Sequence, residues 1–483
     1  MKKALGSSWI AALTAVTLAG LAGCTHLAPS YERPAVPSTV VMPAEPAASS
    51  ASANTTSAPL AWDALIRSPQ LRPLVQQALA NNRDVRVALL SVERARAQLG
   101  VVQADRYPTL GAGLSATRSP SLVTGKEVTL INAGVQFNAW ELDFFGRIAN
   151  LSEAAKAQLL ATEAGRRSAE LTLVAAVVTS YLNLAANIEQ LAMAERALSS
   201  RSDTLKLTQL KADVGAATQL ELVSAQSLVA QAQSAVAQLS RARAQELNNL
   251  SVLVGGPVPT DALPPVPSPE RMDAAADAAN ATTDATDVGG LAEVPGGLSS
   301  EALLARPDVV QAEQALIAAH ANIGAARAAF FPRITLTASA GQVANVFSDL
   351  LQPGHFAWTL SSQALMTIFD AGRNQSNLEI AKINREIAVA QYEKAVQNAF
   401  RDTADALAAQ ASWRDQRSAQ ELQLRATREI ARLTDLRASR GAASELERQD
   451  AQRNLLAAEQ ALVQTRLAEQ LNRLTLWKAM GGG

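Results

Sequence analysis

The sequence predicts a mainly α-helical protein with transmembrane β-strands, built as a duplicated unit of two strands and one long helical hairpin. The stretch VGAATQLELVSAQ at 214–226 returns as RGAASELERQDAQ at 440–452, at an offset of 226 residues. Four segments of about 10 to 13 residues alternate apolar with small or polar residues, as strands do. Two long stretches contain no proline and are rich in alanine, leucine and glutamine. Residues of this kind favour long helices.

The first 23 residues predict a signal peptide. Lys2 and Lys3 form a positive beginning, and an apolar run at 10–21 follows them and ends in small residues. A helix that spans a membrane needs about 20 apolar residues, so this run is short for that purpose. The alternative is a short anchor helix that stays attached.

Cys24 is predicted to carry a lipid. The sequence Leu21-Ala22-Gly23-Cys24 resembles the bacterial lipobox, in which the cysteine thiol is alkylated with diacylglycerol and becomes the mature amino terminus. It is the only cysteine in the chain, so a disulfide and a thiolate metal site are both excluded. Thr25 follows where an aspartate would resemble an inner-membrane retention signal, which favours the outer membrane. The alternative is a cysteine that ends the signal peptide by chance.

Residues 24–60 are expected to form the lipidated cysteine and a flexible tether. The stretch from Pro34 to Pro59 consists largely of proline, alanine, serine and threonine. Such a composition cannot bury a hydrophobic core.

The first repeat is predicted at 61–256. Its opening helix, at 82–105, ends just before Pro108, because proline is a poor continuation of a helix. Period-two alternation then predicts two strands, at about 108–118 and 128–140.

A long helical hairpin completes this repeat. Residues 146–211 have helical composition, and 66 helical residues measure roughly 100 Å at about 1.5 Å per residue. The tip is expected at about 212–218, where Gly215 suits a left-handed helix ending and Thr218 suits the first cap of the returning helix.

The second repeat follows the same plan. A proline-rich and then Ala/Asp/Thr-rich segment at 257–300 reads as a linker or equatorial insert, and 301–483 forms the repeat. Gly100 aligns with Gly324, and Pro108 aligns with Pro332. The expected elements are strands at about 332–344 and 356–368 and a hairpin tip at about 438–444.

The strand lengths are those of transmembrane strands. Four strands cannot close a barrel, and hydrocarbon does not tolerate open sheet edges, so several chains would have to share one barrel. Two chains would give about eight strands, with an interior filled by side chains, and three would give about twelve, with room for a pore. The alternative is a soluble sheet packed on helices.

The sequence contains no pattern typical of catalysis or of metal binding. The three histidines, His26, His320 and His355, lie far apart, and none has ligand spacing with another histidine or with the cysteine. No glycine-rich phosphate loop, nucleophile elbow or HExxH motif occurs. The net charge of −1 gives no reason to expect nucleic acid as a partner. We therefore expect no enzyme activity, no metal and no cofactor.

Several motifs, in this order, resemble the TolC-like outer-membrane factor family. They are the lipobox followed by LAPSYERP, the junctions ELDFFGR and IFDAGR, the segment FFPRITL, the tip GAASELERQDAQ and the ending LWKAMGGG. More narrowly, they are similar to the lipoprotein branch that serves resistance-nodulation-division efflux systems. The resemblance implies a homotrimer with a 12-stranded β-barrel in the outer membrane and a periplasmic α-helical barrel. It also implies an equatorial collar and two partners, a periplasmic adaptor (membrane fusion protein) and an inner-membrane efflux pump.

The function expected from this resemblance is an outer-membrane exit duct. It would conduct drugs or other small molecules passively from the pump and adaptor across the periplasm and the outer membrane. A lipid-anchored periplasmic adaptor or coiled-coil scaffold is the alternative, although adaptors have one hairpin where this chain has two. A tethered cell-surface hydrolase is a third alternative, but the sequence shows no group of residues typical of a catalytic nucleophile.

Two groups of site residues are expected at the hairpin tips. Glycine and alanine there would leave room for the ends of adaptor helices, and the resemblance implies that acidic residues ring the periplasmic entrance. Arg440 or Arg448 would pair with these acids. The alternative for the acids is a solvated helix face with ordinary intrahelical pairs. The docking residues are Gly215, Ala216, Ala217, Gly441, Ala442 and Ala443, and the gate residues are Glu447, Asp450 and Glu221.

Overall fold

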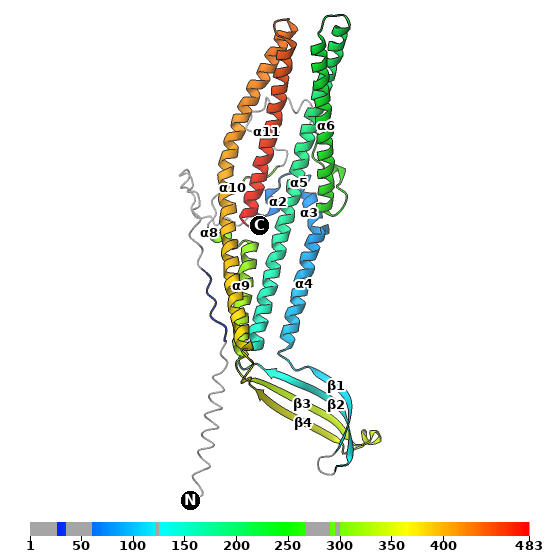
Figure 1. Ribbon diagram of the computed structural model, residues 1–483, viewed down its shortest axis with the longest axis vertical. Coiled ribbons are helices and arrows are strands. Elements are labelled where there is room, and N and C mark those ends of the chain that lie inside the picture. Colours follow the sequence, from blue (N-terminus) through cyan, green and yellow to red (C-terminus); the bar gives the residue numbers. More distant parts are fainter. Residues whose placement is uncertain (1–26, 35–59, 121–124, 267–289, 295–299, 483) are drawn as a thin grey trace. The chain divides into compact units, whose positions relative to one another are not determined.

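A computed structural model describes residues 27–34, 60–120, 125–266, 290–294 and 300–482 of the 483-residue chain (Figure 1). The described residues form two compact units, and long helices run through both. The first unit contains the strands and draws on Leu90–Gly165 and Val310–Ala395.

The elements, in chain order, are α2 (Trp62–Leu65), α3 (Leu71–Asn81), α4 (Arg83–Ala104), β1 (Leu110–Pro120), β2 (Glu127–Leu142), α5 (Arg147–Asp213), α6 (Gln219–Val254), η1 (Thr260–Ala262), α8 (Ser300–Leu304), α9 (Pro307–Ala328), β3 (Arg333–Ala344), η3 (Phe347–Asp349), β4 (Phe356–Leu365), α10 (Arg373–Ser439) and α11 (Glu445–Ala479).

The four strands form one antiparallel sheet in chain order, β1-β2-β3-β4 (Figure 1). The central pair, β2 and β3, joins the two repeats, and Gly134 lies opposite Gly341 in its register. A Cβ on Gly341 would lie 2.2 Å from the carbonyl oxygen of Ala133, and one on Gly134 would lie 2.3 Å from that of Ala340. The backbones therefore approach each other more closely here than a side chain allows.

A register shift between Phe137 and Trp140 interrupts the β2–β3 pairing. Ala139 lies in this interval with φ of 49°, a left-handed conformation that alanine adopts only at a cost. Its backbone N–H donates to the hydroxyl of Thr337 at 3.0 Å. From Phe137 to Trp140 the strand β2 advances three residues, whereas its partner β3 advances two. Trp140 therefore pairs with Leu336 and lies on the same side of the sheet as Phe137.

The register divides the sheet into two chemically distinct faces, since neighbouring residues of a strand point to opposite sides. The polar face includes Ser339 and Thr359, whose hydroxyl oxygens lie 2.7 Å apart in a hydrogen bond. On the opposite face, Trp358 is 69% exposed and Leu114 is 61% exposed in the single chain. This apolar face consists of Leu110, Ala112, Leu114, Ala116, Ile131, Ala133, Val135, Phe137, Ile334, Leu336, Ala338, Ala340, Phe356, Trp358 and Leu360.

Each strand pair leads into a long helix through an aspartate cap. The Asp143 carboxylate accepts the backbone N–H of Ala149 at 2.7 Å, and the Asp370 carboxylate accepts that of Asn374 at 2.9 Å. These bonds satisfy N–H groups that have no partner within the first turn of a helix. The motifs ELDFFGR and IFDAGR therefore mark the beginnings of α5 and α10.

The second unit contains the main hydrophobic core. Trp477 of α11 is fully buried, and its indole N–H donates to the backbone carbonyl of Leu60 at 2.6 Å. The short helices α2 and α3 supply Leu65 and Leu74, which are also fully buried. A window of α5 is apolar enough to cross a membrane, but 61% of that window is buried inside the protein. That window is therefore part of the core.

The residues just after the predicted lipid site pack against α9. Arg33 forms a bidentate ion pair with Glu313, at 2.7 and 2.8 Å, and the Tyr31 hydroxyl donates to the same carboxylate at 3.0 Å. His320 is buried, and Arg385 donates to its Nε2 at 3.0 Å. Tyr31 and Arg33 of the LAPSYERP motif therefore fasten this segment to α9.

The mainly helical fold with a duplicated strand pair and hairpin agrees with the expectation from sequence. The helices α5 and α10 contain 67 residues each. Four expected features lie outside the described residues: the signal peptide, Cys24, most of the tether and the Asp-rich part of the linker.

Candidate functional site

The two hairpin tips have the same backbone geometry. Two residues beyond the end of the first long helix of each hairpin lies a glycine with positive φ, 73° at Gly215 and 70° at Gly441. The next residue donates its N–H back to the helix, from Ala216 to Lys211 O at 2.7 Å and from Ala442 to Arg437 O at 2.8 Å. Glycine reaches this left-handed conformation without the steric penalty of a Cβ. This explains why the glycine occurs in both copies of the turn.

The returning helices begin with reciprocal capping boxes. The Thr218 hydroxyl accepts the backbone N–H of Glu221 at 3.2 Å, and the Glu221 carboxylate accepts that of Thr218 at 2.6 Å. Ser444 and Glu447 repeat this pair at 3.2 and 3.0 Å. The backbone N–H of Thr218 is the main cause that lowers the pKa of Glu221. Both glutamates therefore have a local structural role, which the spacing Thr/Ser-x-x-Glu indicates in the sequence.

Asp450 lies one turn further along α11. Its carboxylate forms an ion pair with Arg453 at 2.8 Å, three residues on. Arg448 pairs with Glu445 through its Nη2 atom at 2.6 Å and approaches Asp435 of α10 at 3.7 Å. Within one chain, Arg448 thus joins the two helices of its own hairpin. In the isolated chain, the Asp450–Arg453 pair is an ordinary intrahelical pair, as in the alternative to the gate.

The tips also expose apolar side chains that the sequence reasoning missed. Leu220 is 76% exposed and Leu446 is 68% exposed, and the two occupy the same position in the repeat. Val214, beside Gly215, is 78% exposed. The recurrence of leucine two residues after each cap was the available clue. The small tip residues that are expected to dock an adaptor thus adjoin exposed apolar side chains, and apolar surfaces often mark contacts with other proteins.

The described residues contain no group of three or more His, Cys, Asp or Glu side chains placed to hold a metal ion. The rings of His320 and Tyr31 pack in a T-shaped arrangement, with centroids 5.6 Å apart. His355 approaches the backbone carbonyl of Val343 through its Nδ1 at 3.2 Å. Each of these two histidines therefore has a local packing or hydrogen-bonding environment of its own.

Comparison with known proteins gives one consistent result. The outer membrane efflux protein family matches residues 74–256 and 298–482. The probable efflux pump outer membrane protein TtgC of Pseudomonas putida is 37% identical over 476 residues, which cover 97% of this chain and 94% of that protein. The cation efflux system protein CusC of Escherichia coli is 37% identical over 471 residues, which cover 96% of this chain and 97% of that protein.

Solved structures agree with the sequence comparison. The open state of the MtrE outer membrane channel of Neisseria gonorrhoeae superimposes with a TM-score of 0.81 at 33% identity, covering 94% of this chain and 98% of that one. A membrane protein from Pseudomonas aeruginosa superimposes with a TM-score of 0.83 at 34% identity, covering 94% and 99%.

Proposed function

The chain belongs to the outer membrane efflux protein family, and we propose that it works as a homotrimer, with one barrel and one tunnel built jointly by three chains. It is an outer-membrane efflux channel, the exit duct of an efflux system. Relatives carry names that refer to the efflux of toluene, antibiotics and cations. The cargo proposed here is drugs or other small molecules.

The observation that carries the proposed trimer is the four-stranded sheet. The apolar side chains of its outer strands β1 and β4 are largely exposed in the single chain, and these two strands have no further strand beside them among the described residues. An open edge in hydrocarbon leaves backbone N–H and C=O groups without partners. Pairing of β1 with β4 of the next chain removes both edges, and three chains then give about twelve strands with a polar interior.

The two hairpins supply the tunnel. The helices α5 and α10 contain 67 residues each, about 100 Å at roughly 1.5 Å per residue. Three chains contribute six hairpins, which would line a passage through the periplasm. A periplasmic adaptor or coiled-coil scaffold, the alternative from sequence, would leave the paired transmembrane strands without a purpose. The proposed role is transport without catalysis.

The hairpin tips are the proposed docking surface for a periplasmic adaptor, which connects the duct to an inner-membrane pump. Gly215, Ala216, Gly441 and Ala442 are exposed, so the backbone of both turns is accessible to a partner. Ala217 and Ala443 are half-buried beside them. Small side chains allow close approach of helix ends, and the exposed leucines of both tips add apolar area.

The proposed gate consists of Glu447 and Asp450 of each chain, with Glu221 from the first hairpin. Three chains would place six carboxylates of α11 around one narrow opening. Such a ring attracts cations and repels anions. Position 224 of the first repeat holds serine where the second repeat holds Asp450, so the second hairpin carries more of the charge.

Cys24 is the proposed site of lipid attachment, and it lies outside the described residues. Two or three acyl chains anchor a protein firmly to a membrane. The contacts of Tyr31 and Arg33 with Glu313 would hold the chain close to the first unit a few residues beyond the lipid.

Disulfide trapping in intact cells tests the trimer. A cysteine at Ser115 of β1 is combined, one variant at a time, with a cysteine at Thr359, Ser361 or Gln363 of β4. All four positions lie on the polar face. Mild oxidation should join three chains covalently in at least one combination, and each single-cysteine variant is its control. Products no larger than two chains in every combination would contradict the trimer.

A further inference from the structure

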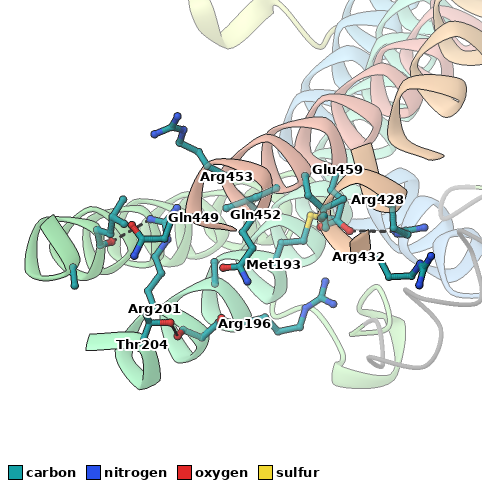
Figure 2. A pocket seen from close by; sticks show the side chains of 17 residues that line it. Met193, Arg196, Arg201, Thr204, Arg428, Arg432, Gln449, Gln452, Arg453 and Glu459 are labelled. Atoms are coloured by element: carbon teal, nitrogen blue, oxygen red, sulfur yellow. Dashed lines mark hydrogen bonds and ion pairs between the residues drawn. The ribbon is translucent and has the colours of Figure 1, made fainter. Parts of the chain in front are cut away.

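A pocket of about 460 Å³ lies between the two hairpins, and every residue that lines it belongs to the second unit (Figure 2). All four hairpin helices, α5, α6, α10 and α11, contribute to its walls. Pockets for small organic ligands usually measure about 300 to 1,000 Å³. The space is therefore large enough for a drug-sized molecule.

The charge of this pocket is strongly positive. Glu459 is the one carboxylate among the described lining residues, and it pairs with Arg428 at 3.2 Å. Two further arginines pair with carboxylates outside the lining, Arg432 with Glu429 and Arg453 with Asp450. The described lining therefore carries five arginines and one glutamate. The arginines are Arg196, Arg201, Arg428, Arg432 and Arg453.

Arg201 is positioned by neutral acceptors. Its Nη1 atom donates to the backbone carbonyl of Leu228 at 3.1 Å and to the side-chain oxygen of Gln231 at 3.5 Å. Among the described residues no carboxylate pairs with it. Its side chain reaches from α5 toward Gln449 of α11 (Figure 2). Burial, and then the charge of Arg453, lower the pKa of Arg201. A bound anion beside this guanidinium would stabilise its positive charge and so counteract this lowering of the pKa.

The remaining wall of the pocket is largely apolar. Met193 is 6% exposed and packs in a cluster with Ala186 and Val463. Leu228 of α6 and Leu456 of α11 lie on other sides of the space. The combination of a fixed cation and apolar walls suits a ligand with one anionic group and an apolar body.

We propose that this pocket binds an amphipathic organic anion of drug size, whose carboxylate or sulfonate contacts Arg201 while its apolar body packs against Met193 and Leu456. The site is contained in one chain, so it does not depend on the trimeric duct. Because both hairpins line the pocket, the bound molecule would link them. Binding should therefore stabilise the folded protein in proportion to ligand concentration.

Calorimetric titration of the purified full-length protein, in nanodiscs of uncharged lipid, tests this site. The probes are 1-naphthoate, its neutral analogue 1-naphthamide, and inorganic phosphate as an anion without an apolar body. Naphthoate should bind at least about tenfold more tightly than either of the others, since a charge-assisted hydrogen bond contributes more than a neutral one. A rise in melting temperature with naphthoate concentration should accompany binding.

Three variants make the test specific. Arg201→Gln should weaken naphthoate binding about tenfold or more, and Arg201→Lys should weaken it less than Arg201→Gln because it keeps the charge but not the geometry of the guanidinium. Arg243→Gln removes a positive charge from an exposed position of α6 outside the pocket and should change nothing. Equal binding of naphthoate and naphthamide would overturn the proposal. So would equal loss in Arg201→Gln and Arg243→Gln. Ion conduction is measured separately, so failure here and failure of the duct are distinguishable.

Discussion

The side chains of Ser444 and Glu447 cap each other's backbone at the start of α11. The serine hydroxyl accepts the Glu447 N–H at 3.2 Å, and the glutamate carboxylate accepts the Ser444 N–H at 3.0 Å. Glutamine also serves at the third position of a capping box. Replacement of Glu447 by glutamine therefore removes the charge and keeps the cap, which allows the gate proposal to be tested without unwinding the helix.

The first prediction concerns the charge of this gate. Glu447→Gln combined with Asp450→Asn should lower the selectivity of the channel for cations and weaken block by multivalent cations, because six carboxylates disappear from the proposed ring. Reversal potentials in a salt gradient measure the effect. Glu221→Gln is the matched control, with the same cap in the first hairpin, and should have the smaller effect. Unchanged reversal potentials in an intact trimer would remove Glu447 and Asp450 from the gate.

The second prediction concerns the tips. Ala442→Trp should abolish export while trimers persist, because a bulky side chain at this exposed turn blocks close approach of an adaptor. Ala442→Ser, a small change at the same position, should export normally. Drug resistance of cells at equal expression provides the measurement. Normal resistance with the tryptophan variant would show that the adaptor contacts another surface.

The third prediction concerns the paired glycines of the sheet. Gly341→Ala places a Cβ 2.2 Å from the Ala133 carbonyl oxygen, so the strands must separate. Overpacking of this kind costs about 1 to 3 kcal/mol, and the temperature at which the trimer dissociates in detergent should fall. Gly113→Ala is the control, since nothing lies within 4 Å of its Cβ position in the single chain. Equal stability of the two variants would show that the sheet relaxes freely at Gly341.

The fourth prediction concerns the lipid. Cys24→Ser, with a cleavable signal peptide, should still fractionate with the outer membrane and support export, because the strands hold the trimer in the bilayer. Fractionation of membranes and periplasm is the measurement. Recovery of the variant as soluble periplasmic protein would mean that the strands do not insert without the lipid.

Much of the fold follows from the sequence because its signals are local. Period-two alternation places β1 and β3, absence of proline permits α5 and α10, and the glycine followed by Thr218 or Ser444 marks each turn. The bulge at Ala139 was not foreseen, because alanine carries no local preference for positive φ. The extra residue is visible only once β2 is paired with β3.

The candidate sites were less accessible to sequence reasoning. The capping role of Glu447 follows from its spacing after Ser444, whereas the pocket around Arg201 requires four helices from both repeats to be brought together. The lining of this pocket comes from positions more than 250 residues apart. No spacing along the chain indicates such a cluster.

Conduction through a planar bilayer tests the central claim most directly. The purified, trimeric protein should form discrete, long-lived pores that conduct ions, and the Glu447→Gln, Asp450→Asn variant should conduct with altered ion selectivity. Monomers kept apart in the same detergent should not conduct, because four strands cannot enclose a pore. The contradicting result is a trimer that inserts into the bilayer but carries no current, both in the natural sequence and in the Glu447→Gln, Asp450→Asn variant. In that case the protein is not an exit duct.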